Sequence, residues 1–164
     1  MTMTATEHLQ SRREMEAEVE PMPDDPQDRA AMLTLADRVE REAPNRELDR
    51  AVAQAINPGS EWRPYSPRGR IKWLYDSAGH PLIYGEERCL HYTTTIDGAA
   101  SLMPDGWVVR VSQIRFGMWR VEAWRGDKSF KSPHDAESVA ESEPQARTTA
   151  ALRARAAEGG DGDG

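Results

Sequence analysis

The chain has 164 residues, of which 38% are hydrophobic and 30% charged, and its formal net charge is -7. This apolar content predicts a folded domain of about 100–120 residues with disordered flanks. The longest apolar runs are only a few residues, which excludes a membrane span, and we expect no secretory signal because the first residues lack an apolar stretch. The single cysteine, Cys89, excludes a disulfide framework and a cysteine-based zinc cluster. Together these observations point to a cytoplasmic protein. No cofactor is expected.

Charged and aromatic residues are distributed unevenly along the sequence. Residues 1–60 and 132–164 carry net charges of -6 and -4, whereas residues 61–131 carry +3 and contain all five Trp, all four Tyr and both Phe. Most of the folding energy should therefore come from the middle segment. The overall acidic balance argues against nucleic acid as a partner, because such binding needs an excess of Lys and Arg facing phosphates.

Composition divides the chain into three parts. Residues 1–28 are acidic and end in a proline-rich run, which predicts a disordered N-terminal extension. Residues 29–158 are predicted to form the folded domain. Residues 159–164 consist only of Gly and Asp, which predicts a flexible tail.

Two helices are expected at the start of the domain. The first begins near Asp28 and is ended by Pro44, and Asn45 is a typical N-cap for the second. The run Asn57-Pro58-Gly59 terminates the second helix. Each helix carries an apolar stripe with a spacing of three or four residues, formed by Met32, Leu35, Ala36 and Val39 in the first and by Leu48, Val52, Ala55 and Ile56 in the second.

The middle of the domain is predicted to alternate between loops and short elements. Residues 60–70 contain two prolines and are predicted to be a loop. A strand at 71–75 and a short strand at 82–84 are expected to form a hairpin. Thr95 is expected to cap a short helix over residues 96–103.

The last part of the domain is predicted to contain further strands and a helix. Strands at 107–114 and 118–124 should pair antiparallel, and an edge strand should begin at Ser129-Phe130. Residues 132–142 are predicted to be a loop, and an Ala-rich helix with a shallow apolar face follows over residues 143–158. This order indicates an α+β fold in which a short antiparallel sheet is packed between helices as a helix–sheet–helix sandwich.

One segment carries a motif. From His91 to Trp107 it reads His-Tyr-Thr-Thr-Thr-Ile-Asp-Gly-Ala-Ala-Ser-Leu-Met-Pro-Asp-Gly-Trp. This resembles the pattern Tyr-Thr-x-Ser-Ile-Asp-x-Ala-x-x-Leu-x-Pro-x-Gly-Trp of the phage ABA-sandwich domain family, small proteins of phages and prophages. Segments 35–40 and 46–49 look like that family's N-terminal helices, and 149–156 is similar to its last helix.

The resemblance covers about residues 30–158 and implies a sheet between helices. It implies no established activity, so no catalytic residue is carried over. Gly98 stands where the family usually has Ala, which is expected to weaken the short helix by up to about 1 kcal/mol.

Two overlapping sets of residues are candidates for a catalytic site and a metal site. Cys89, His91 and Asp97 could supply a nucleophile, a base and an orienting acid, and His80 could join Cys89 and His91 at a metal. No catalytic signature or metal-binding loop surrounds them. The simpler interpretation is a buried thiol beside an ordinary histidine, with Asp97 stabilising a helix N-terminus, so no catalytic or metal site is predicted.

The basic residues of the predicted strands form the candidate ligand site, namely Arg110, Arg120, Trp124 and Arg125. Such a face could hold a small anionic ligand, for example a nucleotide, by stacking and charge-assisted hydrogen bonds. The alternative is a solvated outer face on which Arg and Glu side chains pair. A second basic cluster is expected to be a solvated loop: Arg63, Arg68, Arg70 and Lys72.

With the origin that the resemblance implies, the sequence favours a small accessory protein of a phage or prophage with a non-catalytic role, and an enzyme is the least supported class. Its expected role is to bind a host or phage protein, with counter-defence as one version of that role. The alternative is a binding module for a small anionic ligand through the Arg and Trp face. No membrane partner is expected.

Overall fold

A computed structural model describes residues 25–126, 128 and 131–158. In these residues the chain forms helices and two separate three-stranded antiparallel sheets, with strand orders β1-β2-β3 and β4-β5-β6. The α-helices are α2 (Pro26–Arg41), α3 (Arg46–Ala55), α4 (Ile96–Ala100) and α5 (Glu143–Glu158). The strands are β1 (Glu61–Pro64), β2 (Lys72–Tyr75), β3 (Pro81–Ile83), β4 (Trp107–Gln113), β5 (Trp119–Arg125) and β6 (Ala136–Ala140). Two single 3-10 turns are η1 (Glu86–Arg88) and η2 (Arg115–Gly117).

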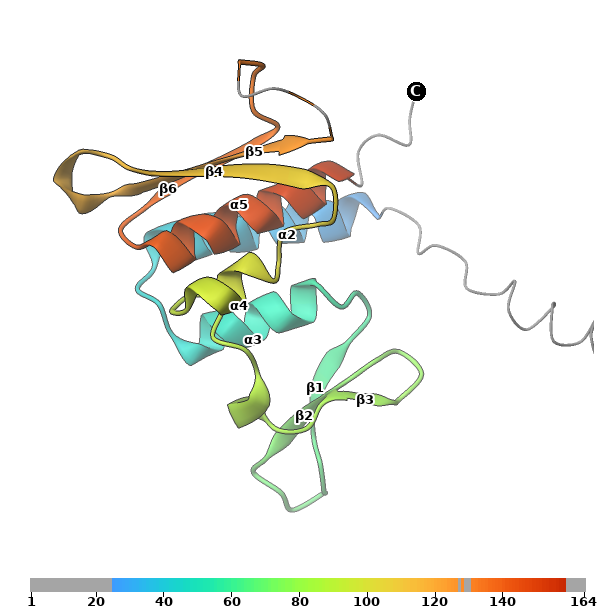
Figure 1. Ribbon diagram of the computed structural model, residues 1–164. Coiled ribbons are helices and arrows are strands. Elements are labelled where there is room, and N and C mark those ends of the chain that lie inside the picture. The colour runs from blue at the N-terminus through green and yellow to red at the C-terminus, as the bar shows by residue number, and fades with distance from the viewer. Residues whose placement is uncertain (1–24, 127, 129–130, 159–164) are drawn as a thin grey trace, which may run out of the picture.

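The predicted α+β class is confirmed. Figure 1 shows the helices as a central layer, with the sheet β4-β5-β6 on one side and the sheet β1-β2-β3 on the other. We call these the large sheet and the small sheet. Whereas the sequence predicts one sheet between helices, the helices themselves lie between two sheets.

Helix α5 explains this arrangement. Ala146 and Ala150 pack on one side of it against Val121 of the large sheet, while Leu152 packs in the cluster that contains residues of α2 and α3. Helix α5 therefore has two apolar faces, whereas the sequence predicts a single shallow one. Because the residues are small, α5 approaches the large sheet closely and still contacts the other helices.

Strand β6 corrects the prediction of a loop at residues 132–142. Ala136, Ser138 and Ala140 alternate as buried residues, and β6 pairs antiparallel with β5. The buried positions are small because they face α5, so the inward face of the segment lacks the large β-branched residues typical of a strand. The edge strand expected at Ser129-Phe130 lies outside the described residues.

Strand β1 corrects the prediction that all of residues 60–70 form a loop. Trp62 faces the interior, and its indole N–H donates to the carbonyl of Arg50 at 3.2 Å. Pro64 is tolerated because β1 is at the edge of the small sheet, where a missing N–H leaves no partner unsatisfied.

The capping residues predicted for α3 and α4 are confirmed. Asn45 caps α3 by accepting from the backbone N–H of Leu48 at 2.9 Å, and Thr95 caps α4 by accepting from that of Gly98 at 3.2 Å. Helix α2 begins slightly earlier than expected, at Pro26, with Asp25 as its N-cap. Most of the extension predicted at 1–28, and the tail at 159–164, lie outside the described residues.

Gly98 has a packing role in this structure. A Cβ atom built there would lie 2.8 Å from the carbonyl oxygen of His91 and 2.7 Å from the hydroxyl oxygen of Thr95. The glycine expected to weaken α4 is therefore what allows the preceding turn to approach it.

None of the helices in the described part of the chain is both long enough and apolar enough to cross a bilayer.

Candidate functional site

The structure brings three of the four residues of the predicted ligand site to one face of the large sheet, where the guanidinium of Arg110 lies 5.4 Å from the ring centroid of Trp124, and separates Arg125 from them. Arg110 and Glu122 are opposite each other in the β4–β5 register, and Arg120 and Trp124 share the same face of the large sheet. The Arg125 side chain points to the opposite face, where its guanidinium lies 5.5 Å from the ring centroid of Trp107.

The outer face of the large sheet is largely neutralised by its own carboxylates. Arg110 makes a bidentate contact with Glu122, with both nitrogen–oxygen distances at 2.8 Å, and Arg120 lies 3.1 Å from Glu137. Trp124 is buried and donates from its indole N–H to the carbonyl of Ser132 at 2.9 Å. This is the arrangement expected of a solvated outer face on which Arg and Glu side chains pair. An anionic ligand would have to displace these carboxylates.

The cysteine and histidine considered for catalysis lie beside Asp49, while Asp97 is exposed on α4. The Nδ1 atom of His91 is 4.0 Å from the Asp49 carboxylate, and the Cys89 thiol faces the Asp49 carbonyl at 3.5 Å. Burial raises the pKa of Cys89 to about 11, so the thiol is protonated at neutral pH. This state is the opposite of what a nucleophilic cysteine needs.

Asp49 is instead the centre of a buried polar cluster with a structural role. Its carboxylate accepts hydrogen bonds from Thr93 and pairs with Arg46 at 3.0 Å. Arg46 also donates to the carbonyls of Glu86 and Cys89, each at 2.8 Å. The cluster ties α3 to the segment that precedes α4. Within the described residues, no group of three or more His, Cys, Asp and Glu side chains is arranged to hold a metal ion.

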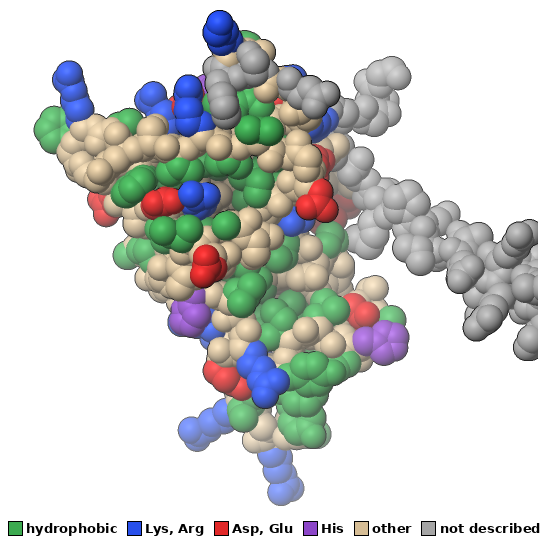
Figure 2. All heavy atoms as spheres, in the orientation of Figure 1, with side chains coloured by type: hydrophobic (Ala, Val, Ile, Leu, Met, Phe, Trp, Pro, Cys, Tyr) green, Lys and Arg blue, Asp and Glu red, His purple; other side chains and the backbone are tan. Residues whose placement is uncertain are grey.

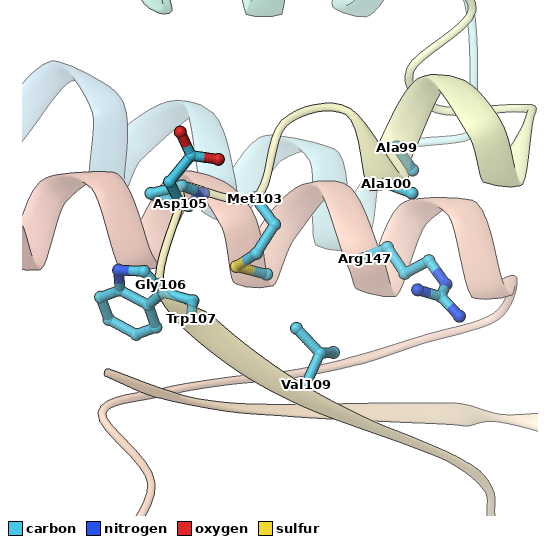
Figure 3. Close-up of a pocket in the computed structure, with 9 residues that line it drawn as sticks. Ala99, Ala100, Met103, Asp105, Gly106, Trp107, Val109 and Arg147 are labelled. Atoms are coloured by element: carbon cyan, nitrogen blue, oxygen red, sulfur yellow. The ribbon is translucent and has the colours of Figure 1, made fainter. Parts of the chain in front are cut away.

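A shallow pocket of about 360 Å³ lies beside the motif that suggested a family. Figure 3 shows side chains from three parts of the chain around it: Met103 after α4, Val109 from β4 and Arg147 from α5. The guanidinium of Arg147 is 2.7 Å from Glu143, so its charge is balanced inside the helix. Among the described residues, the one cation that lines the pocket, Arg147, is already paired, so the pocket has little attraction for an anionic ligand.

The outer face of the small sheet has the features of a contact surface. Alternation along β1, β2 and β3 turns Trp62, Leu74 and Ile83 toward the helices, where they pack in or against the buried cluster. The opposite side chains form a second apolar face that no element of the described chain covers. We call this the aromatic face and define it by Tyr65, Ile71, Trp73, Tyr75, Leu82 and Tyr84.

Trp73 is at the centre of the aromatic face. Its ring stacks on Tyr65 with a centroid distance of 4.1 Å and meets Tyr84 edge-on at 4.9 Å. The outer rings remain accessible, with Tyr65 60% and Tyr84 50% exposed. Ile71 and Leu82 are 56% and 42% exposed. An antiparallel sheet with one face in the core normally has a polar outer face, so this concentration of apolar side chains is unusual.

Basic residues lie on and beside the small sheet, with Arg63 on the aromatic face, Arg68 and Arg70 in the connection between β1 and β2, and Lys72 on the other side of β2. Arg63 lies over the ring of Tyr75 at 5.3 Å and is 3.4 Å from Glu61. In the region that the structure describes, no ion pair joins the remaining exposed cations of this segment to a carboxylate: Arg68, Arg70 and Lys72. Figure 2 shows hydrophobic side chains and projecting basic side chains together over the small sheet, at the lower end of the molecule.

Sequence reasoning placed this basic cluster on a solvated loop and did not identify the aromatic face. The available signal was the strand at 71–75, in which Ile71, Trp73 and Tyr75 alternate with Leu74. Such a strand has one wholly apolar face and a second face on which Leu74 is accompanied by Lys72. One face can be covered by the helices, which leaves the other for a partner.

Comparison with known proteins identifies no relative: no protein-family model, no curated protein and no solved structure matches the chain. The resemblance of residues 91–107 to the phage ABA-sandwich family therefore stays a prediction.

Proposed function

We propose that the protein is a non-catalytic module that binds a segment of another protein through the aromatic face. The observation that carries this proposal is the cluster of exposed Tyr65 and Tyr84 around half-buried Trp73, on a sheet whose other face packs against the helices. Aromatic residues and Arg are enriched at protein interfaces and dominate their binding energy. Exposed Ile71 and Leu82 extend the apolar surface around the rings.

The dimensions of the small sheet favour a short segment over a large folded surface. Its strands contain four, four and three residues. At about 3.3 Å per residue and about 4.8 Å between strands, the sheet measures roughly 13 by 10 Å. Tyr65, Ile71 and Tyr84 extend the face just beyond the strand ends. A stable interface between folded domains buries about 800 Å² of accessible surface on each partner, of which the small sheet would supply only a part.

The resemblance of the motif at 91–107 to the phage ABA-sandwich family supports an accessory role in a phage or prophage. In that setting the protein acts in the bacterial cytoplasm on a host or phage protein, and counter-defence is one version of the role. The alternative of a small anionic ligand on the large sheet has less support, because Arg110 and Arg120 already face carboxylates.

The experiment is selection of short peptides from an unbiased display library on the immobilised full chain. Binding should be lost when Tyr65→Ala and Tyr84→Ala are combined. It should persist in Phe116→Ala, the matched control, which removes an aromatic side chain that is 98% exposed at the distal β4–β5 turn.

Circular dichroism and thermal unfolding establish that each variant is folded, and Tyr84→Ala alone replaces the double variant if that one unfolds. Peptides whose binding depends on Tyr65 and Tyr84 support the proposal. Recovery of none, or of peptides that bind the double variant equally well, contradicts it.

A further inference from the structure

We infer that the segment bound by the aromatic face is acidic, with carboxylate side chains interspersed among apolar ones. This inference rests on the proposed function and names the chemistry of the partner. The argument comes from how differently the chain treats the cations on its two sheets.

On the large sheet, cations are matched by carboxylates of the same face. Arg110 is held by Glu122, and Arg120 by Glu137. His134 also lies close to Glu137, at 3.1 Å. A sheet face that only has to stay solvated is thus supplied with both signs of charge.

On the small sheet, the cations outnumber the carboxylates. Residues 61–84, which contain the whole small sheet, have four basic residues and two acidic ones, Glu61 near Arg63 and Asp76 near His80. Arg68 and Arg70 are exposed in the connection between Tyr65 and Ile71, whereas Lys72 is exposed on the other side of β2, the side of Leu74. The aromatic face therefore carries a local positive charge on a chain whose net charge is -7.

A partner that covers the aromatic face must bring these cations close to its own side chains. Carboxylates at the margin would form ion pairs with them and speed the encounter, whereas basic groups would be repelled. Apolar side chains of the partner would cover the rings of Tyr65 and Tyr84 and the aliphatic side chains of Ile71 and Leu82.

A protein segment fits these observations better than a single-stranded nucleic acid. Bases would stack on the tyrosines, but Ile71 and Leu82 offer aliphatic surface that bases do not need. Tyr65 and Trp73 already stack on each other at 4.1 Å, which leaves no gap for a base between them. A second copy of the chain is disfavoured because it would bring like charges together.

The test uses a peptide selected on the full chain and three labelled forms of it: the acidic form, a neutral form with Gln and Asn in place of the acids, and a charge-reversed form with Lys. If the selected peptide lacks acidic residues, the inference already fails. Affinity is measured by fluorescence anisotropy at about 50 mM and about 300 mM salt. The acidic form should bind at least about tenfold more tightly than the neutral form, and the difference should shrink at high salt.

Matched variants locate the effect. Combining Arg68→Glu with Arg70→Glu should weaken binding of the acidic form about tenfold or more. Combining Arg29→Glu with Arg115→Glu changes the net charge by the same amount on other elements, α2 and η2, and should change affinity by less than about threefold.

The outcomes separate this inference from the function on which it rests. Equal or tighter binding of the neutral or reversed form overturns the acidic partner and leaves peptide binding intact. A thymidine oligonucleotide that binds more tightly, and depends on Tyr65 and Tyr84, also overturns it. Recovery of no peptide that depends on the aromatic face removes the proposed function itself.

Discussion

Thr93 donates two hydrogen bonds to one carboxylate oxygen of Asp49, from its backbone N–H and from its hydroxyl, each with a length of 2.9 Å. Both residues are completely buried, and they are 44 positions apart in the sequence. Arg46 occupies the other carboxylate oxygen at 3.0 Å. A charged group is thus held inside the protein by partners from two distant segments, which fixes the segment before α4 against α3.

Replacing Asp49 with Ala should destabilise the fold by about 3–5 kcal/mol, because Arg46 and Thr93 would lose a buried partner. Urea unfolding measures the change. Glu47→Ala, at an exposed neighbouring position of α3, should stay within about 0.5 kcal/mol of the parent. Similar losses in the two variants would mean that the buried cluster is not a source of stability.

Gly98→Ala should destabilise the protein although Ala favours helices by about 1 kcal/mol. The new Cβ would meet the carbonyl oxygen of His91 at 2.8 Å, and backbone shifts of that kind cost about 1–3 kcal/mol. Thermal unfolding provides the measurement, with Ala100→Gly as the control for helix propensity at an exposed site of α4. A more stable Gly98→Ala protein would show that the turn has room to move.

Stability should fall as pH rises from about 9 toward 11, partly because of Cys89. Burial raises the pKa of its thiol from 9.0 to about 11, so the folded protein keeps a proton that the unfolded chain has lost. The contribution is fully present below pH 9. Urea unfolding across this range should show a weaker decline in Cys89→Ala, and an identical slope in both proteins would refute the assignment. Burial also raises the pKa of Tyr92, to about 12, so some decline should remain in the variant.

Phe116→Asn should raise stability by about 0.5–1 kcal/mol. Phe116 has a φ of 65° and is 98% exposed, so it bears backbone strain without packing in return. Asn adopts this conformation more readily, whereas Phe116→Ala keeps the strain and should leave the melting temperature nearly unchanged. A lower melting temperature for Phe116→Asn would indicate contacts of the ring that outweigh the strain.

The features that could be predicted from sequence are local. Asn45 and Thr95 act as caps through hydrogen bonds within four residues. The apolar stripes of α2 and α3 can be read from the sequence because the buried residues recur at helical spacing. Strand β6 was not predicted because its inward-facing residues are small. They are small because they pack against α5, and the sequence of the strand alone does not reveal that neighbour.

The two most informative clusters depend on long-range contacts. Tyr65, Trp73 and Tyr84 meet only when three strands pair, and Asp49 reaches Thr93 only after α3 docks. Sequence reasoning considered Asp97 as the acid near Cys89 and His91 but favoured a role at a helix N-terminus; Asp97 lies in the first turn of α4, and the carboxylate beside Cys89 and His91 is that of Asp49.

Helix α5 supplies residues to each of the apolar clusters: Leu152 to the one shared with α2 and α3, Ala154 to the one around Trp107, and Ala150 to the one around Val121. A ribosome makes α5 after all of these partners. Each cluster is therefore incomplete until α5 has been made and has docked, and the earlier segments expose unfinished apolar surface up to that step. Docking of this one helix is thus the step that joins the large sheet to the other helices.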